Sequence, residues 1–259
     1  FPADLPRVLP PNPQPPNHRH ASHRSQMKFT PLHHAVDNGH LHAVEILLRE
    51  GRCDPNAKDQ NGATPMHWAA GAGRVDVLAA LASRGAYVHG EDVAGATPLH
   101  WAAAKGREDA VPALLERGAP LDQMDGDGLT PLHRAAAMGH ARCVKALMRE
   151  GADPSRVDAR GNNALHLACE GGQVGAVRAI LSGEREAAKR AFAGVNEAGL
   201  TPTETSARAH EGSLPLLMEF KETTRVRAAP AKPCVERHYI IGKEKYERYA
   251  RKSAEGGEQ

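Results

Sequence analysis

Short apolar stretches alternate with glycines and with runs of polar residues along most of the chain. One kind of stretch begins after a Thr-Pro pair and stops at a glycine, which predicts a short helix because threonine caps free N–H groups and proline suits the first helical position. A second kind, such as residues 41–49, places Val44, Leu47 and Leu48 on one helical face. Asp, Asn and Gly follow over 54–62 and predict a projecting hairpin turn.

This unit recurs with an almost constant step. The Thr-Pro-Leu-His sequence or its equivalent begins at residues 30, 64, 97, 130 and 163, so the spacings are 34, 33, 33 and 33 residues. A degraded sixth copy begins 38 residues later, at Thr201. One such unit cannot bury its own apolar face, so we predict that consecutive units stack and share one core.

The 33-residue period with Thr-Pro-Leu-His-x-Ala resembles the ankyrin repeat family. The resemblance implies an all-α solenoid of helix-turn-helix units with short β-hairpin loops. It covers residues 27–224 as about six repeats, which start near residues 27, 60, 93, 126, 159 and 196. It also implies that the repeated histidine ties the hairpin to the first helix. The structural motif then consists of Thr30, His33, Thr64, His67, Thr97, His100, Thr130, His133 and His166.

The last two copies depart from this pattern. The fifth has Asn163-Ala164 in place of Thr-Pro, and the sixth lacks both Leu and His, which predicts a polar terminal cap. The extra residues between them fall within 183–193, a charged and helix-favouring segment that we expect to extend the second helix or its following loop. Pro112 must lie near the first turn of its helix, because a later position would kink that helix.

Both ends of the chain lie outside the repeats. Residues 1–26 are rich in Pro and His and have almost no aliphatic pattern, so we predict a disordered segment. Residues 225–259 begin as a Pro-containing linker and continue as a basic tail that we expect to be helical in part. The roles of these two ends are not specified by any motif.

The chemistry-bearing residues argue against catalysis and against a bound metal. Five of the fifteen histidines recur once per repeat, about 10 Å apart at a helix-packing distance, so they do not converge on one ion. Cys169 lies one turn after His166, but no third orienting group accompanies the pair, and Ala70 fills the same position in an earlier repeat. We therefore predict that the protein is not an enzyme and has no cofactor.

Two tryptophans give the main indication of a binding surface. Trp68 and Trp101 follow the repeated histidine in neighbouring repeats, and we call this position the slot; packing against the next repeat would also explain a tryptophan there. Trp and Arg dominate binding hot spots, and the resemblance implies a partner across the hairpin tips and the concave side of the first helices. The predicted protein-binding residues are Trp68, Trp101, Arg134, His34, Lys105, Met138, Gln60, Asn61, Asp127 and Arg160.

The resulting functional prediction is a protein–protein interaction adaptor or scaffold. Two alternatives stay open, namely a regulatory ankyrin fragment of a larger enzyme or multidomain protein, and a nucleic-acid-associated factor that uses its basic ends. Nucleic acid is disfavoured because acidic residues interleave the basic ones of the tail. The chain contains no apolar run long enough for a membrane span. The four cysteines form no paired motif, which favours a reducing compartment inside the cell. We therefore expect the cytoplasm, with the nucleus as an alternative, and we expect a monomer.

Overall fold

The computed structural model describes residues 29–51 and 53–224. The predictions for 1–26 and for 225–259 lie outside these ranges. The first helices of the six repeats are α2 Pro31–Asp37, α4 Pro65–Ala72, α6 Pro98–Ala104, α8 Pro131–Ala137, α10 Ala164–Glu170 and α13 Pro202–Ala209. The second helices are α3 Leu41–Arg49, α5 Val75–Ser83, α7 Ala110–Leu115, α9 Ala141–Arg149, α11 Val174–Leu181 and α14 Leu214–Thr224, the last preceded by the short 3-10 helix η2 Glu211–Ser213.

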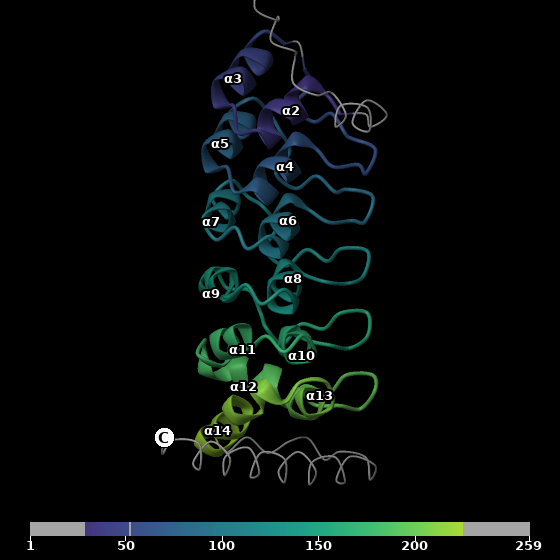
Figure 1. Ribbon diagram of the computed structural model, residues 1–259, viewed down its shortest axis with the longest axis vertical. Helices are drawn as coiled ribbons and strands as arrows, with labels where there is room; N and C mark the ends of the chain where they lie inside the picture. The colour runs from purple at the N-terminus through teal and green to yellow at the C-terminus, as the bar shows by residue number, and fades with distance from the viewer. Residues whose placement is uncertain (1–28, 52, 225–259) are drawn as a thin grey trace, which may run out of the picture.

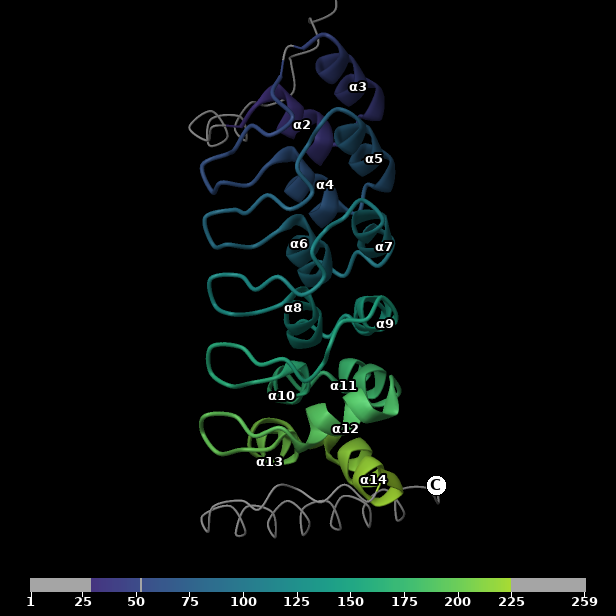
Figure 2. The same cartoon turned by 180° about the vertical axis from the view of Figure 1, so that it is seen from behind.

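The helices form two layers of an elongated stack. The first helices lie above one another in one layer, the second helices form the other, and the hairpins project in a row from the side of the first helices (Figure 1). The view from behind shows the same order of repeats from one end to the other (Figure 2). The expected all-α solenoid of helix-turn-helix units is therefore confirmed.

The hairpins are tight turns with very little strand pairing. Each closes with two backbone hydrogen bonds of the kind made by the Asp92 N–H to the Ala96 carbonyl and by the Gly95 N–H to the Asp92 carbonyl, both at 3.0 Å. Neighbouring tips are also joined, since the Val93 N–H donates to the Asn61 carbonyl at 2.9 Å. Among the described residues, the only β-bridge is an isolated one between Val157 and Asn163, so the expected β-hairpins are turns without extended strands.

One continuous core runs between the two layers. The second residue of the first helix is buried in each of the first five repeats, and small alanines further along let the helices approach closely. Cys169 occupies such an alanine position with no exposed surface, and burial raises the pKa of its thiol to about 12. The thiol is therefore protonated at neutral pH, as expected of a packing residue. The buried second positions are Leu32, Met66, Leu99, Leu132 and Leu165.

The repeated histidine both starts its own helix and holds the next repeat. In the second repeat, the Thr64 backbone N–H donates to the His67 Nδ1 at 3.1 Å, which completes a capping box. The ring proton must then lie on Nε2, which donates to the carbonyl of Ala96 in the next hairpin at 3.0 Å. His33, His100 and His166 donate to carbonyls of the following repeat in the same way, namely those of Ala63, Leu129 and Leu200. His133 donates instead to the carbonyl of Arg156, which lies between α9 and the next hairpin. The expected tie between hairpin and helix thus joins different repeats.

Burial keeps these imidazoles neutral. Desolvation lowers the pKa of His67, His100 and His133, and it lowers the pKa of His166 to about 4. The neutral ring is also what the hydrogen bonds require, because Nδ1 accepts while Nε2 donates. The described residues contain no group of three or more metal-ligating side chains.

The inserted segment forms a separate helix, so the expectation of an extended second helix or loop was wrong. Helix α11 ends at Leu181, and α12 runs over Arg185–Ala193 after a break at Gly183. Its residues Ala187, Ala188, Ala191 and Phe192 are buried, because this spacing places them on one helical face. Phe192 lies against Phe220 of α14, with ring centroids 5.4 Å apart.

Two other expectations concern helix ends. Pro112 is the third residue of α7, so it lies in the first turn as expected, where its missing N–H costs no helical hydrogen bond. The sixth repeat keeps a complete helix start, in which Glu204 replaces the histidine and its carboxylate accepts from the Thr201 N–H at 2.8 Å. However, Thr203, Glu204 and Thr205 are buried, so this helix is not a polar cap that faces outward.

Two glycines of the third repeat show why the glycine series recur. Both have positive φ, 69° at Gly106 and 85° at Gly118. A Cβ on Gly106 would lie 2.7 Å from Nδ1 of His140, whose Nε2 donates to the Ala104 carbonyl at 3.0 Å. A Cβ on Gly118 would meet no atom within 4 Å. The first glycine is therefore needed for backbone conformation and for stacking, and the second for conformation alone.

We predict that Gly106→Ala destabilises the stack more than Gly118→Ala does. The Gly118 variant should lose about 1 kcal/mol of unfolding free energy from the positive φ, and the Gly106 variant about 1 kcal/mol more because the His140 hydrogen bond is disturbed. Urea unfolding followed by circular dichroism measures both. Equal losses in the two variants would contradict the stacking role of His140.

We also predict that acid destabilises the stack through its buried imidazoles. The ordinary pKa of 6.5 falls to about 4 at His166, so between these values the unfolded chain takes up a proton that the folded chain refuses. The stability that the neutral His166 ring gives to the folded chain is therefore fully present above pH 6.5, and it is lost as the pH falls from 6.5 to about 4. His166→Gln should lower the unfolding free energy near neutral pH and reduce its dependence on pH. His42→Gln, at an exposed position, should leave the unfolding free energy near neutral pH unchanged. Unfolding free energies that fall equally steeply in His166→Gln and wild type would refute this.

Candidate functional site in a groove along the first helices

An aspartate at the base of each hairpin organises the turn from within. The Asp92 Oδ1 accepts backbone N–H groups from Ala94 and Ala96, both at 2.9 Å. This pattern satisfies two donors of the turn with one carboxylate oxygen. Sequence reasoning treated these aspartates only as turn formers, although their 33-residue spacing would have singled them out. The equivalent contacts in other hairpins are made by Asp59, Asp125 and Asp158.

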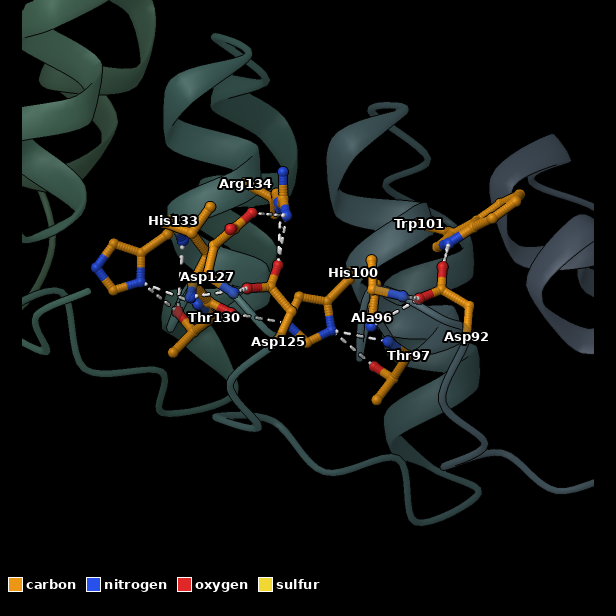
Figure 3. Close-up of polar contacts among 12 residues, drawn as sticks. Asp92, Ala96, Thr97, His100, Trp101, Asp125, Asp127, Thr130, His133 and Arg134 are labelled. Carbon is orange, nitrogen blue, oxygen red and sulfur yellow. Dashed lines mark hydrogen bonds and ion pairs between the residues drawn. The ribbon is translucent and has the colours of Figure 1, made fainter. Parts of the chain in front are cut away.

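The second oxygen of the aspartate fixes the slot side chain of the same repeat. Trp101 Nε1 donates to Asp92 Oδ2 at 2.9 Å, and Trp68 makes the same bond to Asp59 at 3.1 Å. Arg134 donates to Asp125 Oδ2 through Nε at 2.9 Å and through Nη2 at 2.6 Å. Figure 3 shows the pairs of Trp101 with Asp92 and of Arg134 with Asp125 along neighbouring first helices.

Arg134 is therefore an ion-paired residue and not a free surface cation. The side chain of its partner Asp125 is fully buried, and the exposed carboxylate of Asp127 lies 3.3 Å from the same guanidinium. A buried carboxylate that loses its partner is costly. Removing Arg134 would consequently affect stability as well as any binding.

The tryptophans form part of an aromatic row. The ring centroids of Trp68 and Trp101 are 5.8 Å apart, and Phe29 lies edge-on to Trp68 at 4.9 Å. Both indoles remain half-buried, so each has one region in contact with neighbours and another open to solvent. The packing interpretation and the binding interpretation of the slot thus apply to different parts of the same side chains.

A groove of about 510 Å³ opens beside this row, and this volume is within the range of about 300–1,000 Å³ seen for ligand pockets. It brings together four predicted residues that lie far apart in the sequence. Its lining consists of Trp68 from α4, Trp101, Ala104, His100 and Lys105 from α6 and its end, Arg134 from α8, and Asp92, Ala94 and Ala96 from the hairpin between α5 and α6.

The other predicted residues lie around this groove and outside its lining. Asp127 does not line the groove itself, but its carboxylate pairs with Arg134, which does. The remaining ones are exposed on the hairpin tips or on first helices: Gln60 and Asn61 on one tip, Arg160 on a distant tip, His34 on α2 and Met138 at the end of α8. His34 reaches the aromatic row through Phe29, with ring centroids 5.2 Å apart.

Within the described part of the chain, no helix has the length and apolar character needed to cross a membrane.

Comparison with known proteins agrees with the architecture. The family model described as ankyrin repeats (3 copies) matches residues 12–92, 32–125, 87–158 and 142–224. The human ASB11 ankyrin repeat domain is a similar solved structure, with 26% sequence identity and a TM-score of 0.65 over 82% of this chain and 97% of that domain. Ankyrin repeats are generally protein–protein interaction modules. On the extent of the family match, the chain belongs to the ankyrin repeat family.

Proposed function

We propose that this protein is an adaptor that holds another protein chain against the groove of its second to fourth repeats. The observation that carries the proposal is the convergence of Trp68, Trp101, Lys105 and Arg134 on one open groove. The proposed function is binding and involves no catalysis. The nucleic-acid alternative depends on the basic chain ends, which lie outside the described residues. A monomeric state and a cytoplasmic location stay predictions.

The rigidity of the lining supports this proposal. The aspartates of the hairpins hold Trp68, Trp101 and Arg134 in one orientation before any partner arrives. Ordering a rotamer-rich side chain on binding costs about 0.5–1.5 kcal/mol. Because these three side chains are already ordered, a partner does not meet this cost. Half-exposed Trp and Arg at the centre of an interface are also the residues that carry most binding energy.

We predict that filling the groove abolishes partner capture without unfolding the stack. Ala104→Gln places a longer, helix-compatible side chain into the groove, and Lys105→Glu reverses an exposed charge there. Affinity capture with the full chain, followed by mass spectrometry, should recover a set of proteins that both variants lose. Lys145→Glu is the matched control, because Lys145 is exposed on α9 in the other helical layer.

The proposal fails if the same proteins are recovered with wild type, Ala104→Gln and Lys105→Glu. Thermal melts of all four chains separate lost binding from lost folding. A capture pattern that only Lys145→Glu changes would place the interface on the second helices.

We predict that the slot tryptophans contribute to stability through two separable terms. Trp101→Phe keeps an aromatic ring but removes the donor to Asp92, and it should cost about 1 kcal/mol of unfolding free energy. Trp101→Ala also removes the contacts with Trp68 and should cost more. Urea unfolding of both variants measures the difference. If Trp101→Phe unfolds at the wild-type midpoint, the hydrogen bond to Asp92 does not stabilise the hairpin.

A further inference from the structure

The groove contains one cationic side chain that no hydrogen bond or ion pair engages among the described residues. The Asp92 carboxylate accepts three N–H groups, from Ala94, Ala96 and Trp101. Arg134 is paired with Asp125 and Asp127. Burial keeps the pKa of His100 below its ordinary value, so that imidazole is uncharged. Among the described residues, Lys105 alone lines the groove as a charged side chain with no hydrogen bond or ion pair.

The rest of the lining is mainly apolar. The two indoles and the small side chains of Ala94, Ala96 and Ala104 form a surface against which an aliphatic or aromatic side chain can pack. The ring centroids of Trp68 and Trp101 are 5.8 Å apart, so the two rings leave no room for a cationic group between them. Lys105 would in addition repel a cation at this place.

The hairpin tips that border the groove are joined to one another through their backbones. The Val93 N–H donates to Asn61, and the Gly126 N–H donates to Ala94 at 2.8 Å, so the groups between neighbouring tips are already paired. A partner therefore cannot bind here by adding a strand, and its recognition must depend on side chains.

We propose that the occupant of the groove is a partner peptide segment in which an apolar side chain stands next to a carboxylate. The apolar side chain packs on Trp68, Trp101 and the alanines, and the carboxylate pairs with Lys105. A single carboxylate matches the single uncompensated cation. A doubly charged phosphate would bring more negative charge close to Asp92 and to the exposed Asp127. This inference rests on the proposed adaptor function and names the chemistry of its partner.

A displayed library of random peptides, selected on the full chain, tests the inference directly. Wild type should select peptides with Asp or Glu beside a large apolar residue. Lys105→Glu should instead select Lys or Arg at that position, because the charge of the site is reversed. For one selected peptide, Lys105→Ala should weaken binding about fivefold, the equivalent of about 1 kcal/mol, and added salt should weaken wild-type binding.

The outcomes separate this inference from the adaptor proposal. If Ala104→Gln abolishes binding of the selected peptides but Lys105→Glu changes neither their sequences nor their affinity, the groove binds a partner and the carboxylate inference is wrong. If phosphopeptides bind wild type more tightly than their carboxylate counterparts, the anion is misidentified. If no selected peptide depends on Ala104 or Lys105, both proposals fail. Binding that Lys145→Glu leaves unchanged confirms that the effect is local to the groove.

Discussion

The hydrogen bonds from the buried imidazoles to the chain that follows their own helix pair determine how the repeats fit together. One ring accepts at Nδ1 from its own helix start and donates at Nε2 to a carbonyl about 30 residues ahead, as His67 does with Ala96. Because both bonds need the neutral tautomer, burial and hydrogen bonding favour the same state of the ring. In the sixth repeat, Glu204 completes the helix start but has no donor for a further hairpin. Within the described residues, this linkage therefore ends at the sixth repeat.

A second interaction makes the hairpins part of the binding surface. One carboxylate, such as that of Asp92, holds the backbone of the turn with one oxygen and a slot side chain with the other. The turn and the slot residue are therefore ordered together. For this reason a role in packing and a role in binding are compatible for Trp101, whose donor faces the hairpin while part of its ring stays exposed.

The groove occurs where the slot residues are large and their neighbours are small. Trp68, Trp101 and Arg134 come from consecutive repeats, and Ala104 leaves space between them. The flanking repeats have His34 or Leu167 in the slot, and neither contributes to the lining. The repeat framework is thus uniform, and the candidate site results from a few substitutions within it.

The sequence by itself determined the helix starts and the helical class, because a 33-residue period with Thr-Pro and glycine at fixed positions specifies the local structure of each unit before the units stack. It also identified the slot, since tryptophan recurs there at one repeat's distance. Only the tertiary structure decided that Arg134 is neutralised by Asp125 while Lys105 is not, and that 185–193 folds as a separate helix against Phe220. The contact of Phe192 with Phe220 depends on how the last helices stack, which the spacing along the chain does not specify. Arg134 and Asp125 are only nine residues apart, but the folded hairpin is needed to show that their side chains meet.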